Sequence, residues 1–330
     1  MNKTSIEWTH RPETRGEAGG MTWNPIRARY VNAPRLGDNG GKIVRPNSGT
    51  FCTRISPGCT NCYASTINKR FGNGLEFTVP NLEKVEFFID DRILREPLQQ
   101  KKPCTIFVGD MFDLFHEAIP DSLIEPVVAI AAYADWHTFQ FLTKRADRMR
   151  SHFRQLSAVE WTHSRGRLHP WPFENIWLGV SVESQKYADE RIPLLLQTPA
   201  AVRFLSVEPQ LEEIDFEPES IDGMPTVNML TGADWCDPPI PGIDWVIVGG
   251  ESGPGARPFN LAWAELVLRQ CRAAGVPFFM KQVGSNPHGK TTQETIPMQR
   301  LKDRKGGDPS EWPESLRVRE FPVVREVVTA

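Results

Sequence analysis

Short apolar segments recur along the chain, and each has the length and composition of a buried β-strand. They are rich in β-branched and aromatic side chains, which is typical of strands that are covered on both faces. We therefore predict strands at residues 105–109, 138–143, 175–180, 202–207, 244–249 and 276–280.

Amphipathic stretches with helical spacing lie between several of these segments. They cover residues 121–134, 185–197 and 260–274, where Asn260 is a suitable N-cap and Gly275 a suitable stop. Strands that alternate with helices indicate a parallel sheet with helical crossovers. The expected fold class is α/β, as a parallel (β/α) barrel, partial or complete, with loop insertions.

Polar or charged residues follow the predicted strands. In a (β/α) barrel the carboxyl ends of the strands surround the active site. Strand ends at any protein surface also carry charges, but the repetition over six strands favours a common site. The residues expected to line this mouth are Asp110, Lys144, Ser181, Glu183, Glu208, Glu251 and Lys281.

Three of the six cysteines fall within eleven residues. Cys52, Cys59 and Cys62 have the spacing C-x₆-C-x₂-C, and Pro57 and Gly58 supply a tight turn between them. Thiolates this close together can hold a soft metal centre. Because three protein ligands leave one coordination position open, we predict an iron–sulfur cluster with one accessible iron.

A structural zinc site is the main alternative, and it needs a fourth ligand. The sequence has no second C-x₂-C pair, and the nearest candidates are His116 and Cys104. Cys104 opens a predicted strand, so it is expected at the opposite end of the barrel from the mouth. A zinc-stapled nucleic-acid-binding module without catalysis therefore stays open as a second interpretation, and an accidental grouping of cysteines as a third.

Several short motifs also resemble a known family. They lie at residues 6–9, 22–25, 56–64, 113–116, 141–145, 176–183, 203–209, 243–253 and 275–282. Over roughly residues 5–285 the chain resembles an uncharacterised phage-associated protein family, named for phage gene products thirty-seven and sixty-eight. That family in turn resembles the radical-SAM superfamily.

The resemblance implies a 4Fe–4S cluster on the three cysteines, with S-adenosylmethionine bound at the open iron. An electron donor would drive its cleavage to a 5′-deoxyadenosyl radical. Asp110 stands where a Gly-Gly-Glu element usually binds the methionine amino group, and Tyr63 follows the last cysteine in place of the usual preceding aromatic. Lys144, Ser181 and Glu183 complete the expected cofactor site. The first cysteine gap is six residues instead of the usual three.

A nucleic-acid base or nucleotide is the expected substrate, to be modified or repaired. This expectation comes from the phage setting of the family and from a basic, aromatic stretch at residues 145–171. The same stretch also fits an ordinary surface helix. The net charge of −3 gives no overall positive field that would attract nucleic acid.

Glu208 and Glu251 offer a third function, because two carboxylates at strand ends can serve as general acid and base in a barrel hydrolase, with Lys281 beside them. The Gly-rich residues 249–255 fit either a phosphate-binding turn or a tight turn after a strand.

The length of 330 residues suits one α/β barrel. We expect the barrel at residues 1–285, with insertions at 24–50, 154–173 and 212–243, and a C-terminal extension at 286–330. No apolar run approaches a membrane span, and the first residues lack an apolar signal core. We expect a cytoplasmic protein that does not bind membranes, with cysteines kept as thiols or metal ligands.

Overall fold

A computed structural model describes residues 1–11, 19–31, 48–156, 161–162, 168–169, 171–217, 228–233, 239–289 and 301–323. The chain forms two compact units. The first contains residues 1–141 and 162–168, and the second contains residues 142–161 and 169–330. The expected insertions at 24–50, 154–173 and 212–243 and the expected extension at 286–330 lie partly outside the described residues.

Among the described residues, the largest sheet has eight strands in the hydrogen-bonded order β1-β2-β5-β6-β9-β10-β11-β13. Their bounds are Asn2–Lys3, Gly20–Trp23, Thr105–Val108, Thr138–Thr143, Ile176–Ser181, Val202–Val207, Trp245–Gly249 and Phe278–Gln282. β1 is antiparallel to β2, whereas β2-β5-β6 and β9-β10-β11-β13 are parallel runs. The prediction of an α/β fold with a mostly parallel sheet is therefore confirmed.

All six predicted strands are present: β6 and β10 have the predicted bounds, and the ends of the other four shift by one or two residues. The largest shift is at β13, which begins at Phe278 and contains Lys281, so Lys281 lies within the strand and not after it. The sequence prediction omits β2, a four-residue strand that begins with Gly20 and pairs with β5. This omission matters because β2 carries Asn24 directly after its last residue.

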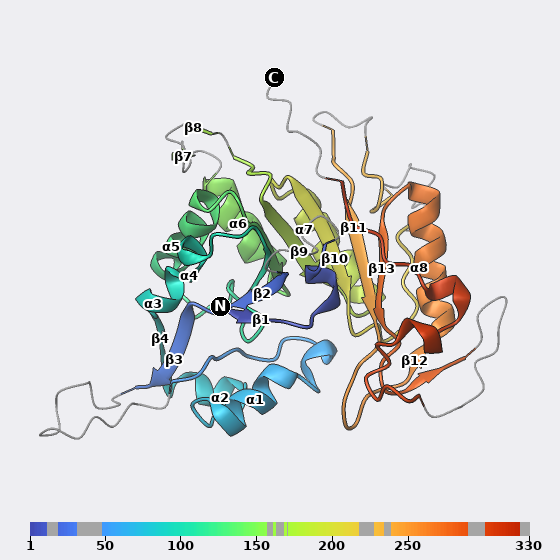
Figure 1. The fold of residues 1–330 in the computed structure, drawn as a ribbon, viewed down its shortest axis with the longest axis horizontal. Helices are drawn as coiled ribbons and strands as arrows, with labels where there is room; N and C mark the ends of the chain where they lie inside the picture. Colours follow the sequence, from blue (N-terminus) through green and yellow to red (C-terminus); the bar gives the residue numbers. More distant parts are fainter. Residues whose placement is uncertain are drawn as a thin grey trace, which may run out of the picture. The chain divides into compact units, whose positions relative to one another are not determined.

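The first unit adds an antiparallel hairpin and short helices to its strands (Figure 1). The hairpin strands are β3 (Ile26–Tyr30) and β4 (Val85–Ile89), and the helices are η1 (Glu7–Thr9), η3 (Pro57–Cys59), α1 (Tyr63–Phe71), α2 (Val79–Leu82), α3 (Asp91–Leu94), α4 (Glu96–Gln99) and α5 (Asp121–Tyr133). A buried apolar cluster joins the hairpin to α1. Its members are Ala28, Phe51, Ala64, Leu75, Phe77 and Val85.

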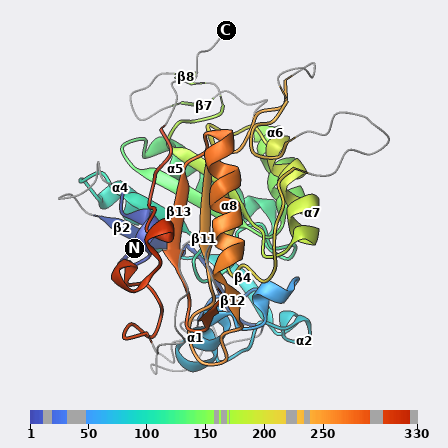
Figure 2. The same cartoon turned by 90° about the vertical axis from the view of Figure 1, so that its right-hand side faces the viewer.

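The second unit places helices against its parallel strands, and Figure 2 shows α8 (Leu261–Ala274) across β11 and β13. As predicted, the Asn260 side chain caps α8 by accepting from the Ala262 N–H, and Gly275 follows its end with a φ of +68°. The other elements of this unit are α6 (Ala146–Leu156), α7 (Gln185–Leu196), β12 (Phe259–Asn260), β14 (Pro287–His288), η4 (Pro309–Glu311) and η5 (Glu314–Leu316). The short strands β7 (Trp161–Thr162) and β8 (Leu168–His169) each have one residue in either unit.

In the part of the chain that the structure describes, every helix is too short or too polar to cross a lipid bilayer.

Candidate functional site

The three clustered cysteines lie in a segment that the first unit's core holds in place. Cys59 ends η3, and Cys62 immediately precedes α1. Phe51 is fully buried beside Cys52, and both Cys52 and Cys62 pack against the apolar cluster that contains Phe51. The three cysteine side chains are half-buried thiols. Apolar packing of the neighbouring residues therefore fixes the backbone of this segment.

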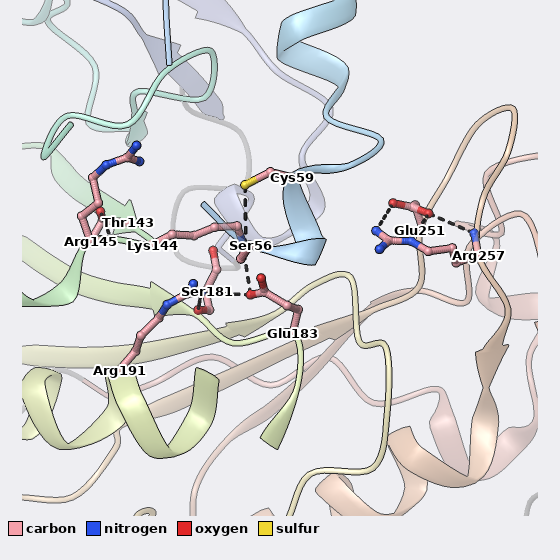
Figure 3. Close-up of polar contacts among 10 residues, drawn as sticks. All are labelled: Ser56, Cys59, Thr143, Lys144, Arg145, Ser181, Glu183, Arg191, Glu251 and Arg257. Carbon is pink, nitrogen blue, oxygen red and sulfur yellow. Dashed lines mark hydrogen bonds and ion pairs between the residues drawn. The ribbon is translucent and has the colours of Figure 1, made fainter. Parts of the chain in front are cut away.

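The thiols have local contacts in this structure. Cys52 Sγ donates to the Thr53 carbonyl oxygen at 3.6 Å, and Cys59 Sγ lies 3.7 Å from Ser56 Oγ (Figure 3). Among the described residues, no group of three or more His, Cys, Asp or Glu side chains is placed to hold a metal ion. The donor chemistry fits a soft metal centre, because thiolates near the amino end of a helix are stabilised by its dipole. Loading such a centre requires the thiols to leave these contacts and converge.

Tyr63 ties the start of α1 to the carboxyl end of β5. Its hydroxyl donates to the Asp110 carbonyl oxygen at 2.6 Å, while the residue as a whole stays about half exposed. The structure thus brings together two residues, Tyr63 and Asp110, that the sequence assigns to a cofactor site. The link also holds Cys62, which precedes Tyr63, close to this end of β5.

The Asp110 side chain is held by residues of β2 and by the residue that follows that strand. Asn24 Nδ2 donates to Asp110 Oδ1 at 2.6 Å, and Asn24 Oδ1 accepts from the Met111 N–H at 3.2 Å. Burial raises the pKa of the Asp110 carboxyl above its ordinary value, although hydrogen bonds from Asn24 and Thr22 act in the opposite direction. A cationic group beside this partly buried carboxyl would act against the desolvation and favour its ionised form.

A second tie joins the cysteine segment to the loop after β5. The Thr53 hydroxyl lies 2.9 Å from His116 Nε2, and His116 Nδ1 accepts from the Ala118 N–H at 3.1 Å. These partners assign the ring proton to Nε2, which then donates to Thr53. His116 is fully buried and uses both ring nitrogens in these bonds. It positions the residue next to Cys52, and this arrangement does not supply the fourth zinc ligand that the alternative interpretation needs.

Cys104, the other candidate for a fourth ligand, directly precedes β5. Its thiol lies 3.3 Å from Nδ1 of the buried His137. Cys104 therefore lies at the amino end of the strand, as the sequence predicts, whereas Asp110 follows its carboxyl end.

In the second unit, three of the predicted cofactor residues lie together around a buried carboxylate. Glu183 is fully buried, and its Oε2 atom lies 2.9 Å from Arg191 Nη1 and 3.6 Å from Lys144 Nζ (Figure 3). Arg191 Nη1 also donates to the Ser181 carbonyl oxygen at 2.7 Å. Glu183 therefore holds the Lys144 ammonium group near the ends of β6 and β9 and neutralises part of its charge.

Arg191 was not identified from the sequence, although it is almost fully buried on α7. Its guanidinium also lies 4.1 Å from the centre of the Tyr187 ring. The only available signal was a charged residue at a core-facing position of an amphipathic helix.

Glu208 and Glu251 have different cationic partners. Glu208 Oε1 accepts from Lys281 Nζ at 2.6 Å, as expected for a partly buried lysine at this position. The Arg257 side chain donates two hydrogen bonds to the Glu251 carboxylate, from Nη2 to Oε1 at 2.7 Å and from Nε to Oε2 at 3.0 Å (Figure 3). Each of the two carboxylates proposed for hydrolysis is thus engaged in its own ion pair.

The Gly-rich turn after β11 uses its backbone donors internally. The Gly250 N–H donates to the Gln282 carbonyl oxygen at 3.0 Å, and the Gly253 N–H donates to Ser285 Oγ at 2.9 Å. A Cβ atom at Gly250 would lie 2.5 Å from the Val283 carbonyl oxygen. Of the two interpretations of residues 249–255, these contacts support a tight turn after the strand.

The functional residues that the sequence does not predict are those that form hydrogen bonds or ion pairs with the predicted site residues or with their neighbours. Asn24 and Thr53 do so in the first unit, and Arg191 and Arg257 in the second. Asn24 could have been predicted from the motif at residues 22–25. There a polar side chain follows a short apolar segment, as it does after the predicted strands.

Comparison with curated proteins and with solved structures gives no match to this chain. One family model does match, over residues 44–311, and its description is "Protein of unknown function (DUF5131)". The matched range covers most of the chain and includes the cysteine segment and the strand-end residues predicted from the sequence, whereas β2 and Asn24 lie outside it. The chain therefore belongs to this family of proteins of unknown function.

Proposed function

We propose that this protein is a radical-SAM-like iron–sulfur enzyme that modifies or repairs a nucleic-acid base or a nucleotide. Cys52, Cys59 and Cys62 would hold a 4Fe–4S cluster. When bound, the cluster supplies the electron that cleaves S-adenosylmethionine to a 5′-deoxyadenosyl radical. The proposal includes a cytoplasmic setting, an electron donor, a phage association of the family, and closure of the parallel strands into a partial or complete barrel.

The observation that carries the proposal is the pair of hydrogen bonds that join the cysteine segment to the loop after the carboxyl end of β5. Tyr63 bonds the Asp110 carbonyl at 2.6 Å, and Thr53 bonds His116 at 2.9 Å. Thr53, which follows Cys52, and Tyr63, which follows Cys62, are thereby anchored to the loop that follows one strand of a parallel sheet. The carboxyl ends of parallel strands are where α/β proteins place their ligands.

Asp110 is suited to bind the amino group of S-adenosylmethionine. Its carboxyl is buried and has a raised pKa, so a cationic amino group beside it would favour the carboxylate form. Asn24 holds Oδ1 at 2.6 Å and fixes the direction of the side chain. The exposed part of the Tyr63 ring offers a flat apolar face on which an adenine can stack.

Charged groups of both signs also lie at or near the strand ends of the second unit. Lys144, positioned by Glu183 beside Ser181, would bind a carboxylate or phosphate of the cofactor or substrate. Glu208, Glu251 and Lys281 are the proposed residues for substrate contact. Because Glu208 and Lys281 already form an ion pair, they can exchange this pairing for polar groups of a bound nucleotide.

Reconstitution tests the proposal. The protein is incubated anaerobically with iron and sulfide, desalted, and assayed for metals and for 5′-deoxyadenosine after addition of S-adenosylmethionine and a reductant. We expect about four irons per chain, and loss of both iron and product in Cys52→Ala, Cys59→Ala and Cys62→Ala.

Cys271→Ala is the matched control, since Cys271 is buried in α8, and it should keep both. One zinc per chain with no iron would instead support a zinc-stapled module. Iron binding that survives removal of all three cysteines would refute the proposal.

A further inference from the structure

The helix that follows the last clustered cysteine exposes a row of apolar side chains. Tyr63, Ile67 and Phe71 of α1 are 53%, 42% and 73% exposed. Residues four apart lie on the same side of a helix, so these three form a continuous stripe. An adjacent side of α1 buries Ala64 and Asn68. Single exposed apolar residues are common, but a stripe along one helix is typical of a binding surface.

The charges around this stripe are positive. Residues 48–75 include Arg54, Lys69 and Arg70 but no aspartate or glutamate. All three basic residues are exposed. The next acidic residue along the chain, Glu76, forms an ion pair of 2.5 Å with Lys69, and the backbone carbonyl of Asp110 accepts from the Tyr63 hydroxyl at the start of the stripe. The segment therefore carries local positive charge on a chain whose net charge is −3.

Arg54 belongs to the same surface as the helix, although it lies before the cysteines. A hydrogen bond from Lys69 and the charge of Lys69 lower the pKa of Glu76, and the charge of Arg54 adds to this effect. Arg54 is itself exposed and lies in the segment that leads into α1. We call Arg54, Tyr63, Ile67, Lys69, Arg70 and Phe71 the α1 surface.

Aromatic and cationic side chains of the α1 surface lie close to one another. The Arg70 guanidinium lies 4.8 Å from the centre of the Phe71 ring. Proteins that bind single-stranded nucleic acid combine aromatic faces, on which bases stack, with basic side chains that contact the phosphates. A protein partner would use the apolar stripe but would give no reason for the absence of acidic residues. The charge thus favours a polyanion over an apolar protein surface.

We propose that the α1 surface binds single-stranded nucleic acid through base stacking on Phe71 and phosphate contacts to Arg54 and Arg70. The inference rests on the proposed function in one respect, since it names the polymer that carries the substrate base. Tyr63 both begins the stripe and bonds to Asp110 beside the cysteine segment. A strand bound along α1 therefore passes the candidate site.

Fluorescence anisotropy of labelled single-stranded oligonucleotides tests this with the full chain, purified without reconstitution. Phe71→Ala should weaken binding by about 5- to 150-fold, the loss expected for one stacked base. Arg54→Gln and Arg70→Gln should each weaken binding and flatten its dependence on salt by about one phosphate contact. Matched DNA and RNA oligonucleotides tell the two polymers apart.

Two exposed residues elsewhere in the first unit serve as controls. Tyr133→Ala removes an aromatic residue that is 47% exposed on α5, and Lys101→Gln removes an exposed charge. Both should bind like the wild type. The proposal is overturned if the wild type binds neither polymer at physiological salt, or if Phe71→Ala and Tyr133→Ala behave alike.

A concentration-dependent dimer that Phe71→Ala abolishes would also overturn it, because the stripe would then be a protein interface. Since the binding assay uses no metal, failure of iron reconstitution leaves it unaffected, and the two proposals can fail separately.

Discussion

Removal of the buried Glu183 carboxylate should be strongly destabilising. Glu183 is fully buried, and Arg191, which is 2% exposed, pairs with it at 2.9 Å. Deleting one partner of a buried ion pair leaves an uncompensated charge and typically costs about 3–5 kcal/mol. We expect Glu183→Ala to lower the free energy of unfolding by about this amount, because the Ser181 carbonyl and the Tyr187 ring replace only part of the lost interaction.

Urea unfolding followed by circular dichroism measures this effect. Asp147→Ala is the matched control, because Asp147 is 72% exposed and pairs with Arg150 on the surface of α6. An exposed pair contributes about 0–1 kcal/mol, so this variant should stay near the wild type. The double variant Glu183→Leu/Arg191→Met removes both charges and should recover much of the loss. If Glu183→Ala were no less stable than Asp147→Ala, the pair would not be enclosed as described.

Three further results follow from the first unit. Asn24→Ala should reduce the unfolding free energy by about 2–4 kcal/mol in urea unfolding, because it removes one hydrogen bond to a carboxylate and one to a backbone N–H; an unchanged midpoint would contradict this. The raised pKa of Asp110 means that its stabilising contribution is complete below its unfolded pKa of about 3.9 and is lost as pH rises through the folded pKa. Asp110→Asn should therefore raise the melting temperature at neutral pH and flatten the pH profile in thermal unfolding, and a lower melting temperature would show that the carboxyl is not desolvated. Gly109→Ala should cost about 1–2 kcal/mol or more, since φ is +77° and a Cβ would lie 3.0 Å from the Phe112 carbonyl oxygen. This loss of unfolding free energy should exceed that of Gly74→Ala, because Gly74 has a similar φ of +83° but no atom lies within 4 Å of a Cβ added there.

The sequence is sufficient to locate six of the parallel strands, because strands that are buried on both faces consist of continuous apolar runs. It also placed polar residues such as Asp110 and Glu208 after strands, and it predicted that Lys281 pairs with a carboxylate. Strand β2 was not predicted, because it has only four residues and begins with Gly20, so it contains no apolar run long enough to indicate a strand.

The contacts that hold the site depend on tertiary structure. Glu183 and Arg191 meet only because α7 folds back beside β9, and no local sequence spacing requires this. Asn24 and Asp110 are 86 residues apart in the chain and are joined by the pairing of β2 with β5. The directions of the three thiols depend on a loop conformation, which the spacing of cysteines leaves undetermined.

The most direct measurement for the proposed function is the electron paramagnetic resonance spectrum of the reconstituted, reduced protein, recorded with and without S-adenosylmethionine. Three cysteine ligands leave one iron accessible, so the cofactor should change the spectrum of a 4Fe–4S cluster, and Cys52→Ala should abolish the signal. A cluster whose spectrum is unaffected by S-adenosylmethionine, or a protein that takes up only zinc, would contradict the proposal.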